Sequence, residues 1–321
     1  MAIQSIIEPH SGAAIFITLG LKRTEQTEEV LRDLCDRLPS IQNSMRLRYP
    51  ENPLSVVFGI GSNAWDYLFS HAPKPKELVE FQTIPGPKHD AIATPGDLLF
   101  HLKSERTDVC FEAARLVHEL LRDVSDPIDE THGFRYFDGR AIIGFVDGTE
   151  NPIEGDAVSE GYIGDEDPAF AGGSYVFTQK YLHDMDYWNN LTIEEQQKAI
   201  GRRKIDDLEL DDGDKDRNAH TTISKAYRAN GDEAKIIRAN MPFAEPSKNL
   251  FGTYFIGYAA SFETTRTMLE HMFKGNPEGN YDRLLDFSEP VSGSLFFVPS
   301  AALLDSIASG DFGGPAVETR Q

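Results

Sequence analysis

Four side chains suited to acid–base or electrostatic chemistry stand at separate points of the sequence. Asp147 follows the apolar start of GFVDGTENP (144–152), where the DG pair indicates a turn. His220 follows an acidic stretch, in NAHTTISKAY. Arg238 lies within the apolar segment KIIRANMPF, and Asn240, two residues on, points to the same face of a strand. Such groups can transfer a proton, bind a metal and stabilise developing negative charge.

Each of these residues also has a plainer interpretation. Asp147 can hold its own backbone in a turn, instead of presenting a carboxylate at a strand end. A lone histidine such as His220 is usually a surface or core residue, and the alternative is a metal ligand with a neutral imidazole. Arg238 can form a structural ion pair, because an isolated buried charge costs several kcal/mol, or it can face a cavity as a catalytic cation. The residues alone leave these alternatives open.

Several well-known functional motifs are absent from the sequence. None of the nine histidines stands in HExxH, and no Cys or His cluster has zinc-finger spacing. The chain contains no GxGxxG, P-loop or GxSxG motif. These absences argue against a helix-borne hydrolytic zinc site, most nucleotide-dependent enzymes and the nucleophile-elbow hydrolases.

The elements that must position these residues alternate between strand and helix. Short branched apolar runs predict strands at 13–21, 54–60 and 97–103, and leucines spaced by three and four predict a helix between the first two. In the second half we expect further elements at 174–182, 193–201, 235–241, 252–261, 264–273 and 293–300. In both halves a strand leads into a helix of similar length. The first of these helices ends near His118, and the second ends near His271. We therefore expect an α+β protein of two related halves, 1–140 and 141–321, and a single large α+β domain is the alternative.

Two long acidic, glycine-rich segments, 144–173 and 203–219, do not fit this alternation. Loops of this length in a compact protein are usually functional or disordered, so we expect the site to lie there. The run DDLELDDGDKD (206–216) lacks the order of ligands found in an EF-hand. It is interpreted as a solvated loop, and binding of a divalent cation such as calcium or manganese is the alternative.

Composition limits the classes of protein. The 31 basic and 52 acidic residues give a net charge of −21, so nucleic-acid binding is not expected. The two cysteines, Cys35 and Cys110, exclude a disulfide framework and fit a reducing cytosol. The N-terminal segment has no basic n-region and only a short apolar stretch. We expect a cytoplasmic protein without a membrane anchor.

Several segments together resemble the dye-decolorizing peroxidases, with GFVDGTENP as the most specific string. The others are SYVFTQKYLHDMDYW (174–188), QQKAIGRRK (196–204), IIRANMPF (236–243), GTYFIGYA (252–259) and GSLFFVPS (293–300). The length is similar to that of the cytoplasmic bacterial group called class B. The resemblance implies a duplicated ferredoxin-like fold with two antiparallel sheets, peripheral helices and one haem b in the C-terminal half. It also implies reduction of hydrogen peroxide and oxidation of aromatic or phenolic donors, including dyes.

The resemblance also implies roles for individual residues. His220 is the proximal iron ligand, and Asp282 is the carboxylate that accepts a hydrogen bond from its other ring nitrogen. Asp147 and Arg238 are the distal acid and cation that assist cleavage of the peroxide bond, with Asn240 beside them.

Further residues are assigned to the cofactor pocket by the same resemblance. Arg202 matches an arginine that pairs with a haem propionate. The other predicted pocket residues are Gly148, Thr149, Glu150, Thr253 and Phe255. One departure from the family pattern follows His220, where Ser224 and Lys225 replace an expected arginine.

The alternative function is a non-catalytic haem carrier or haem-iron handling protein, which would not need both distal groups. We expect a homo-oligomer, and the C-terminal segment shows no apolar tail of the kind that directs relatives into encapsulin shells. Bulky donors are expected to be oxidised through surface aromatic residues. The candidates are Tyr175, Tyr181, Tyr187, Trp188, Tyr254 and Tyr258, and the alternative is that most of these aromatic residues belong to the core.

Overall fold

The computed structural model describes residues 4–7 and 11–312, and one large antiparallel sheet organises it. Ten strands follow the order β4-β1-β3-β2-β12-β5-β10-β8, with β11 on β5 and β9 on β10. Their bounds are β1 Ala13–Leu21, β2 Ser55–Gly61, β3 Leu98–Ser104, β4 Ser125–Phe134, β5 Ser174–His183, β8 Ile237–Arg238, β9 Met241–Glu245, β10 Leu250–Ala259, β11 Ser288–Pro290 and β12 Ser294–Val298. A separate hairpin joins β6 (Ala226–Tyr227) to β7 (Glu233–Ala234).

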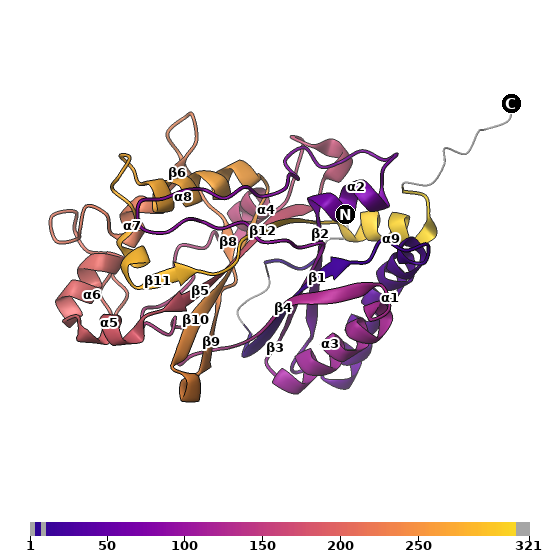
Figure 1. Cartoon of the computed structure of the whole chain (residues 1–321), viewed down its shortest axis with the longest axis horizontal. Helices are drawn as coiled ribbons and strands as arrows, with labels where there is room; N and C mark the ends of the chain where they lie inside the picture. Colours follow the sequence, from indigo (N-terminus) through magenta and orange to yellow (C-terminus); the bar gives the residue numbers. More distant parts are fainter. Residues whose placement is uncertain (1–3, 8–10, 313–321) are drawn as a thin grey trace, which may run out of the picture.

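The helices cover the outer faces of the sheet (Figure 1). Those of the first half are the long helices α1 Thr27–Arg48 and α3 Thr107–Leu121 and the short helix α2 Ser62–Leu68. In the second half they are α4 Glu154–Gly161, α5 Met185–Asn190, α6 Ile193–Ile200, α7 His220–Ile223, α8 Phe262–Lys274 and α9 Ala301–Ser309. The strands and helices predicted from periodicity are present, except that 235–241 is broken between β8 and β9.

The strand order repeats itself, which supports the predicted duplication. In the first half β4-β1-β3-β2 places the strands in the order fourth, first, third, second, and β12-β5-β10-β8 does the same in the second half. This is the ferredoxin-like βαββαβ arrangement, so the predicted α+β class is confirmed. The division at residues 140 and 141 remains a proposal.

The prediction of two separate sheets is wrong in one respect. β12 pairs with β5 on one side and with β2 on the other, through Phe296–Gly61 and Phe297–Ile60. The two four-stranded units therefore form one hydrogen-bonded sheet. Beyond β12, α9 packs against α1, so the last described helix lies with the first half (Figure 1). Pairing β12 with both neighbours satisfies backbone groups that would otherwise be buried without partners.

The sheet curls until β4, at one edge, contacts β9, near the other. This approach requires glycine at position 133, because a Cβ there would stand 2.5 Å from the Cβ of Met241. The enclosed space is filled by side chains of both halves, including Phe16, Tyr254 and Tyr258. We call this set the inner layer. A second core lies outside the sheet, under the helices.

Candidate active site

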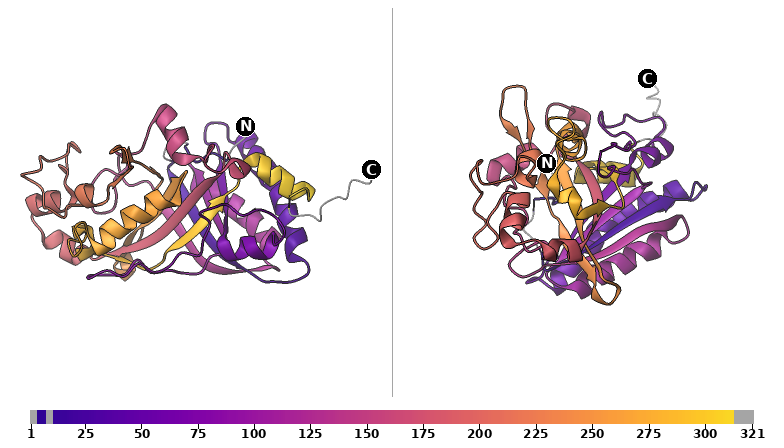
Figure 2. Two further views of the ribbon diagram at one scale, coloured as in Figure 1. Left: turned by 90° about the horizontal axis from the view of Figure 1, so that it is seen from above. Right: turned by 60° about the vertical axis from the view of Figure 1, so that its left-hand side comes forward.

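A cavity of about 1470 Å³, including the part open to solvent, lies on the outer face of the second half. Side chains of β5 and β10 form one wall, and side chains of α8 form another. The helix α8 packs along both strands (Figure 2). Ten of the eleven predicted site residues line it. They are Asp147, Gly148, Thr149, Glu150, Arg202, His220, Arg238, Asn240, Thr253 and Phe255. The eleventh, Asp282, lies directly behind His220.

His220 opens the short helix α7, and Asp282 fixes its imidazole. The His220 Nδ1 stands 2.6 Å from Asp282 Oδ2, and the carboxylate is fully buried. The other oxygen of Asp282 accepts a bond of 2.8 Å from the Leu284 amide. An ionised carboxylate only accepts, so Nδ1 carries the proton and Nε2 keeps its lone pair. The arrangement leaves Nε2 as the ring nitrogen that can bind a ligand in the cavity that His220 lines.

Gly201 allows the end of α6 to approach this helix. Its φ of +93° is the left-handed conformation that terminates α6, and a Cβ would stand 2.0 Å from the hydroxyl of Thr221. The predicted IGRRK segment therefore packs directly against the turn that carries His220.

Asp147 and Asn240 form a second polar pair on the cavity wall. The Asn240 amide nitrogen donates to both carboxylate oxygens of Asp147, at 3.2 and 3.1 Å. The Asn240 oxygen accepts from the Ile256 amide at 3.0 Å, which ties the side chain to β10. The carboxylate of Asp147 therefore bonds across the fold and not within its own turn. The turn itself is present, with Gly148 at a φ of +81°.

Arg238 brings a cation to the same cavity. Its backbone is held by Asn151, whose side-chain oxygen accepts from the Arg238 amide at 3.0 Å and whose nitrogen donates to the Arg238 carbonyl at 2.7 Å. Within residues 4–7 and 11–312 its guanidinium has no carboxylate partner. The structural ion pair considered from the sequence is thus absent from this region, and the charge is available to a ligand.

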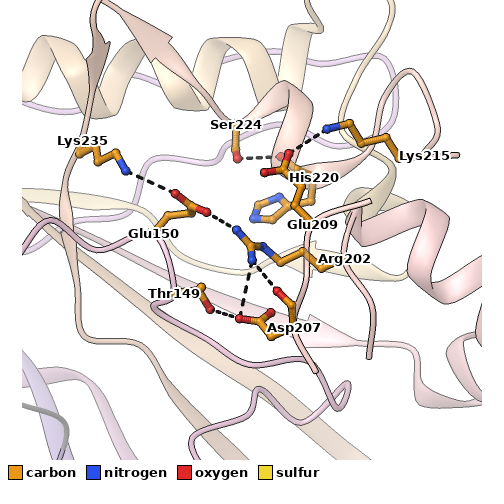
Figure 3. A network of polar contacts seen from close by, with 9 residues as sticks. All are labelled: Thr149, Glu150, Arg202, Asp207, Glu209, Lys215, His220, Ser224 and Lys235. Atoms are coloured by element: carbon orange, nitrogen blue, oxygen red, sulfur yellow. Dashed lines mark hydrogen bonds and ion pairs between the residues drawn. The ribbon is translucent and has the colours of Figure 1, made fainter. Parts of the chain in front are cut away.

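An ion network occupies the mouth of the cavity beside His220 (Figure 3). Arg202 is bonded by Glu150 on one side and by the Asp207 carbonyl oxygen, at 2.7 Å, on the other. Glu150 also pairs with Lys235 at 3.3 Å. Arg202 is 8% exposed, and Glu150 and the Asp207 carbonyl oxygen hold its guanidinium in place. A ligand carboxylate can replace Glu150 on either cation.

Two residues that sequence reasoning missed also reach the cavity. His183 is buried, and its ring nitrogens lie 2.8 Å from the hydroxyls of Ser288 and Thr253. Burial lowers the pKa of His183 to about 4, so the ring is neutral at pH 7. The alternation of Tyr181 and His183 at the end of the predicted strand was a signal for that face. Lys235 had no comparable signal, because its role depends on Glu150.

The departure after His220 changes the wall without removing its positive charge. Ser224 donates from its hydroxyl to the His220 carbonyl at 2.7 Å, which closes the short helix. Lys225 lines the cavity in place of the expected arginine. Its carbonyl accepts a bond of 2.7 Å from His271 on α8.

Most aromatic residues considered as surface electron-transfer sites are buried. Trp188, Tyr254 and Tyr258 are at most 2% exposed, and Tyr175 and Tyr181 are also buried. Tyr187 is 42% exposed and stacks on Phe287, with ring centroids 6.5 Å apart. Of the six candidates, only Tyr187 is therefore exposed, and the other five belong to the core, as the alternative interpretation expects.

The acidic segment 203–219 is largely neutralised by basic partners. Lys215 pairs with Glu209 and Asp212, and Asp216 pairs with Arg283. In the part of the chain that the structure describes, no group of three or more His, Cys, Asp or Glu side chains is arranged to hold a metal ion. No helix among these residues is long and apolar enough to cross a membrane.

The chemistry of the cavity fits a flat, largely apolar cofactor with carboxylate arms. One wall offers the free imidazole nitrogen of His220, and the mouth offers Arg202 and Lys235. The remaining lining is mostly aliphatic or aromatic and excludes water. It includes Ile143, Phe145, Ile200, Phe255, Met268, Leu269, Met272 and Leu284.

Comparison with known proteins identifies relatives over nearly the whole chain. The family descriptions "Dyp-type peroxidase, N-terminal" and "Dyp-type peroxidase, C-terminal" match residues 4–135 and 138–303. A dye-decolorizing peroxidase from Rhodococcus erythropolis is 48% identical over 302 residues, covering 94% of this chain and 88% of the relative.

Two solved structures share the fold. A variant of DypB from Rhodococcus jostii in complex with haem superposes with a TM-score of 0.92 at 45% identity, covering 94% of this chain and 97% of that one. An encapsulated DyP-type peroxidase from Mycobacterium smegmatis gives a TM-score of 0.91 at 48% identity, covering 95% and 97% of the two chains.

Proposed function

The chain belongs to the dye-decolorizing peroxidase family, a family of haem-dependent oxidoreductases, and on that premise we propose how its residues act. In this proposal haem b binds in the cavity on His220, hydrogen peroxide is reduced there, and aromatic or phenolic donors are oxidised. The observation that carries it is the cavity itself, which brings a proximal ligand, a carboxylate and an unpartnered cation to one space.

On the proximal side, His220 would ligate the iron through Nε2. Asp282 accepts the Nδ1 proton at 2.6 Å, which orients the ring and makes it a stronger electron donor. When bound, haem supplies an iron that coordinates peroxide and takes up its oxidising equivalents. Asp282 holds the His220 ring in a fixed orientation.

On the distal side, Asp147 would move the proton. Its carboxylate takes a proton from one peroxide oxygen and returns it to the other, directly or through a water. Asn240 holds both carboxylate oxygens, so the acid is positioned before peroxide arrives. Arg238 stabilises the negative charge that develops on the leaving oxygen.

At the mouth, Arg202 and Lys235 would bind the haem propionates. Both cations already hold the carboxylate of Glu150, which is 40% exposed at its side chain. A propionate offers the same charge and geometry as that carboxylate. Thr149, Gly148, Thr253 and Phe255 complete the wall around the cofactor.

The test is the reaction of haem-loaded protein with one equivalent of hydrogen peroxide, followed by stopped-flow absorption. We expect fast conversion of the Soret band in the wild type and its return on adding an aromatic donor. Arg238→Leu should keep haem and slow the conversion by ~10²- to 10³-fold. Unchanged kinetics in both Arg238→Leu and Asp147→Asn would contradict the assigned roles.

A non-catalytic haem carrier is the second candidate. The observation against it is the joint presence of Asp147 and Arg238, because a carrier needs no distal acid and no free cation. Slow bleaching by peroxide without a fast Soret change would favour the carrier. The net charge of −21 favours cationic donors at low salt, and this preference should weaken as salt is raised.

Assembly and location complete the proposal. We expect a homo-oligomer located in the cytoplasm, and light scattering of the purified protein tests the first point. The predicted lack of an encapsulin-targeting tail concerns the C-terminal end, of which residues 313–321 lie outside the described residues. Co-expression with an encapsulin shell tests that expectation.

A further inference from the structure

A histidine and a tyrosine are hydrogen-bonded inside the curled sheet, away from the cavity. The His101 Nδ1 on β3 stands 2.8 Å from the hydroxyl oxygen of Tyr258 on β10. Both side chains are 0% exposed. The pair therefore joins a strand of the first half to a strand of the second half within the inner layer.

The pair belongs to a stack of four aromatic rings. Phe16 stacks on Tyr254 with centroids 4.0 Å apart and on His101 with centroids 4.7 Å apart. His101 and Tyr258 follow at 6.2 Å, with planes inclined by 19°. The two tyrosines of β10 thus lie at the two ends of the stack, and the two rings between them come from the first half. Close, nearly parallel rings favour the passage of an electron.

The hydrogen-bond inventory sets the protonation of the pair. Among the described residues His101 Nε2 has no partner. If the Tyr258 hydroxyl donates to Nδ1, only the Nε2–H group of His101 is left without a partner among the described residues. If Nδ1–H donates to the phenol oxygen, both Nε2 and the phenol O–H are left without one. The hydroxyl is therefore the donor. Burial, followed by the charge of Lys103, keeps the pKa of His101 well below its ordinary value. Burial likewise raises the pKa of Tyr258.

Packing alone does not account for these residue types. A phenylalanine at either position would fill the inner layer without burying polar atoms, and burying an unmatched polar atom is costly. A polar pair retained at such a cost, with a base placed on a phenol, is a signal of function.

Tyr258 is separated from the cavity only by the sheet. In the pairing of β10 with β8, Tyr258 is opposite Ile237 and its neighbour Gly257 is opposite Arg238. Phe255, three residues earlier on β10, points to the other face and lines the cavity. Arg238, the proposed distal cation, therefore lies on the neighbouring strand, opposite the residue that precedes Tyr258.

We propose that Tyr258 and His101 form an internal redox pair that holds one oxidising equivalent when no donor is present. This inference rests on the proposed peroxidase function, because peroxide is the source of the oxidising equivalents. It adds a protein site of oxidation that is closed to solvent and distinct from the haem.

The step balances in electrons and protons. Tyr258 loses one electron to the oxidised cofactor, which is thereby reduced by one equivalent. The phenolic O–H bond breaks, and its proton forms a bond with Nδ1 of His101. A donor later returns the electron, and the proton moves back to the oxygen. Since burial and Lys103 disfavour a charged His101, the oxidised pair is a strong oxidant and readily takes that electron.

The experiment is freeze-quench electron paramagnetic resonance of the haem-loaded protein, mixed with one equivalent of peroxide without donor. Ring-deuterated tyrosine identifies a tyrosyl signal by its altered line shape. We expect the signal in the wild type and its loss in Tyr258→Phe. The matched control is Tyr254→Phe, on the same strand and in the same layer but without a histidine partner, which should keep the signal.

The role of His101 has a separate readout. In His101→Phe the phenol loses its acceptor, so the high-field spectrum of any tyrosyl radical should shift to the values of one without a hydrogen bond. If Tyr258→Phe fails to bind haem, the wild type labelled with ¹⁵N-histidine should show coupling of the radical to a histidine nitrogen.

Two results would overturn the inference: a tyrosyl signal that persists in Tyr258→Phe, or a wild type without one. The Soret band separates this failure from that of the proposed function. If peroxide converts the Soret band quickly but Tyr258 is never oxidised, only the redox pair is wrong. If peroxide leaves the Soret band unconverted, the peroxidase proposal itself fails.

Discussion

The two halves share a strand order, yet only the second contains the large cavity. In the first half, β1 and β2 are connected by the 22-residue helix α1, whose Leu31, Leu34 and Leu38 fill the space over the sheet. In the second half, the helices in the connection from β5 to β8 are the short α5, α6 and α7, of six, eight and four residues, and the β6–β7 hairpin follows them. Where the first half has one long amphipathic helix, the second half has short helices, and the cavity that His220 and Arg202 border lies there.

The helices that remain confirm this comparison. α3 in the first half and α8 in the second follow equivalent strands and both pack against the sheet. α3 meets α1 across a closed core, whereas α8 turns Met268, Leu269 and Met272 toward the cavity. The same four-stranded arrangement thus carries a filled core in the first half and a cavity in the second, depending on which helices cover the outer face of the sheet.

The largest expected effect is at the ligand. His220→Ala should abolish stable haem binding, because the iron would lose the one imidazole nitrogen that Asp282 orients toward the cavity. Absorption of the Soret band and the haem-to-protein ratio measure it. His132→Ala, on exposed β4 of the first half, is the control and should bind haem normally. A His220→Ala protein with a normal spectrum would remove the cavity's assigned role.

Leucine-to-alanine changes compare the packing of the two halves directly. Leu34→Ala, in the filled core, should lower the free energy of unfolding by about 2–5 kcal/mol. Leu269→Ala, which borders the cavity, should lie near the lower end of that range because fewer atoms surround it. Urea unfolding of the haem-free proteins measures both. Equal losses would show that the second half is as tightly packed as the first.

His183 makes the stability of the second half depend on pH. Its folded pKa is about 4 against an ordinary 6.5, so between these values the unfolded chain binds a proton that the folded chain does not. The contribution of His183 to the free energy of unfolding is complete above about pH 6.5. About 3 kcal/mol of it is lost as the pH falls toward 4.

Urea unfolding of haem-free wild type and His183→Gln at pH 7.5 and 4.5 checks this. The variant should lose less free energy of unfolding on acidification than the wild type. His132→Gln, an exposed histidine, should follow the wild type. Parallel curves for His183→Gln and wild type would refute the assigned linkage.

The smallest effect is expected at the positioning amide. Asn240→Ala leaves the carboxylate of Asp147 without its donor, so we expect a rate of Soret conversion by peroxide about tenfold lower with haem still bound. Asn240→Asp is a useful second variant, since it keeps the size and removes the donor. A loss as large as that of Arg238→Leu would make Asn240 more than a positioning residue.

From the sequence alone, most elements could be predicted, together with residues that line one cavity. Strands such as β1 and helices such as α1 follow from local periodicity, which depends only on neighbouring residues. The GFVDGTENP string and its companions pointed to the cofactor and to ten residues that line one cavity. A motif of this kind indicates which side chains form a site, whereas the overall composition does not.

Tertiary structure alone decided the contacts between distant segments. His220 and Asp282 are 62 residues apart, and Asp147 and Asn240 are 93 apart, so no local pattern fixes their geometry. The curling of the sheet also placed Tyr258 beside His101, and the pairing of β12 with β2 joined the two predicted sheets into one. Local preferences act along the chain, whereas cavities and buried polar pairs arise only when separate segments pack.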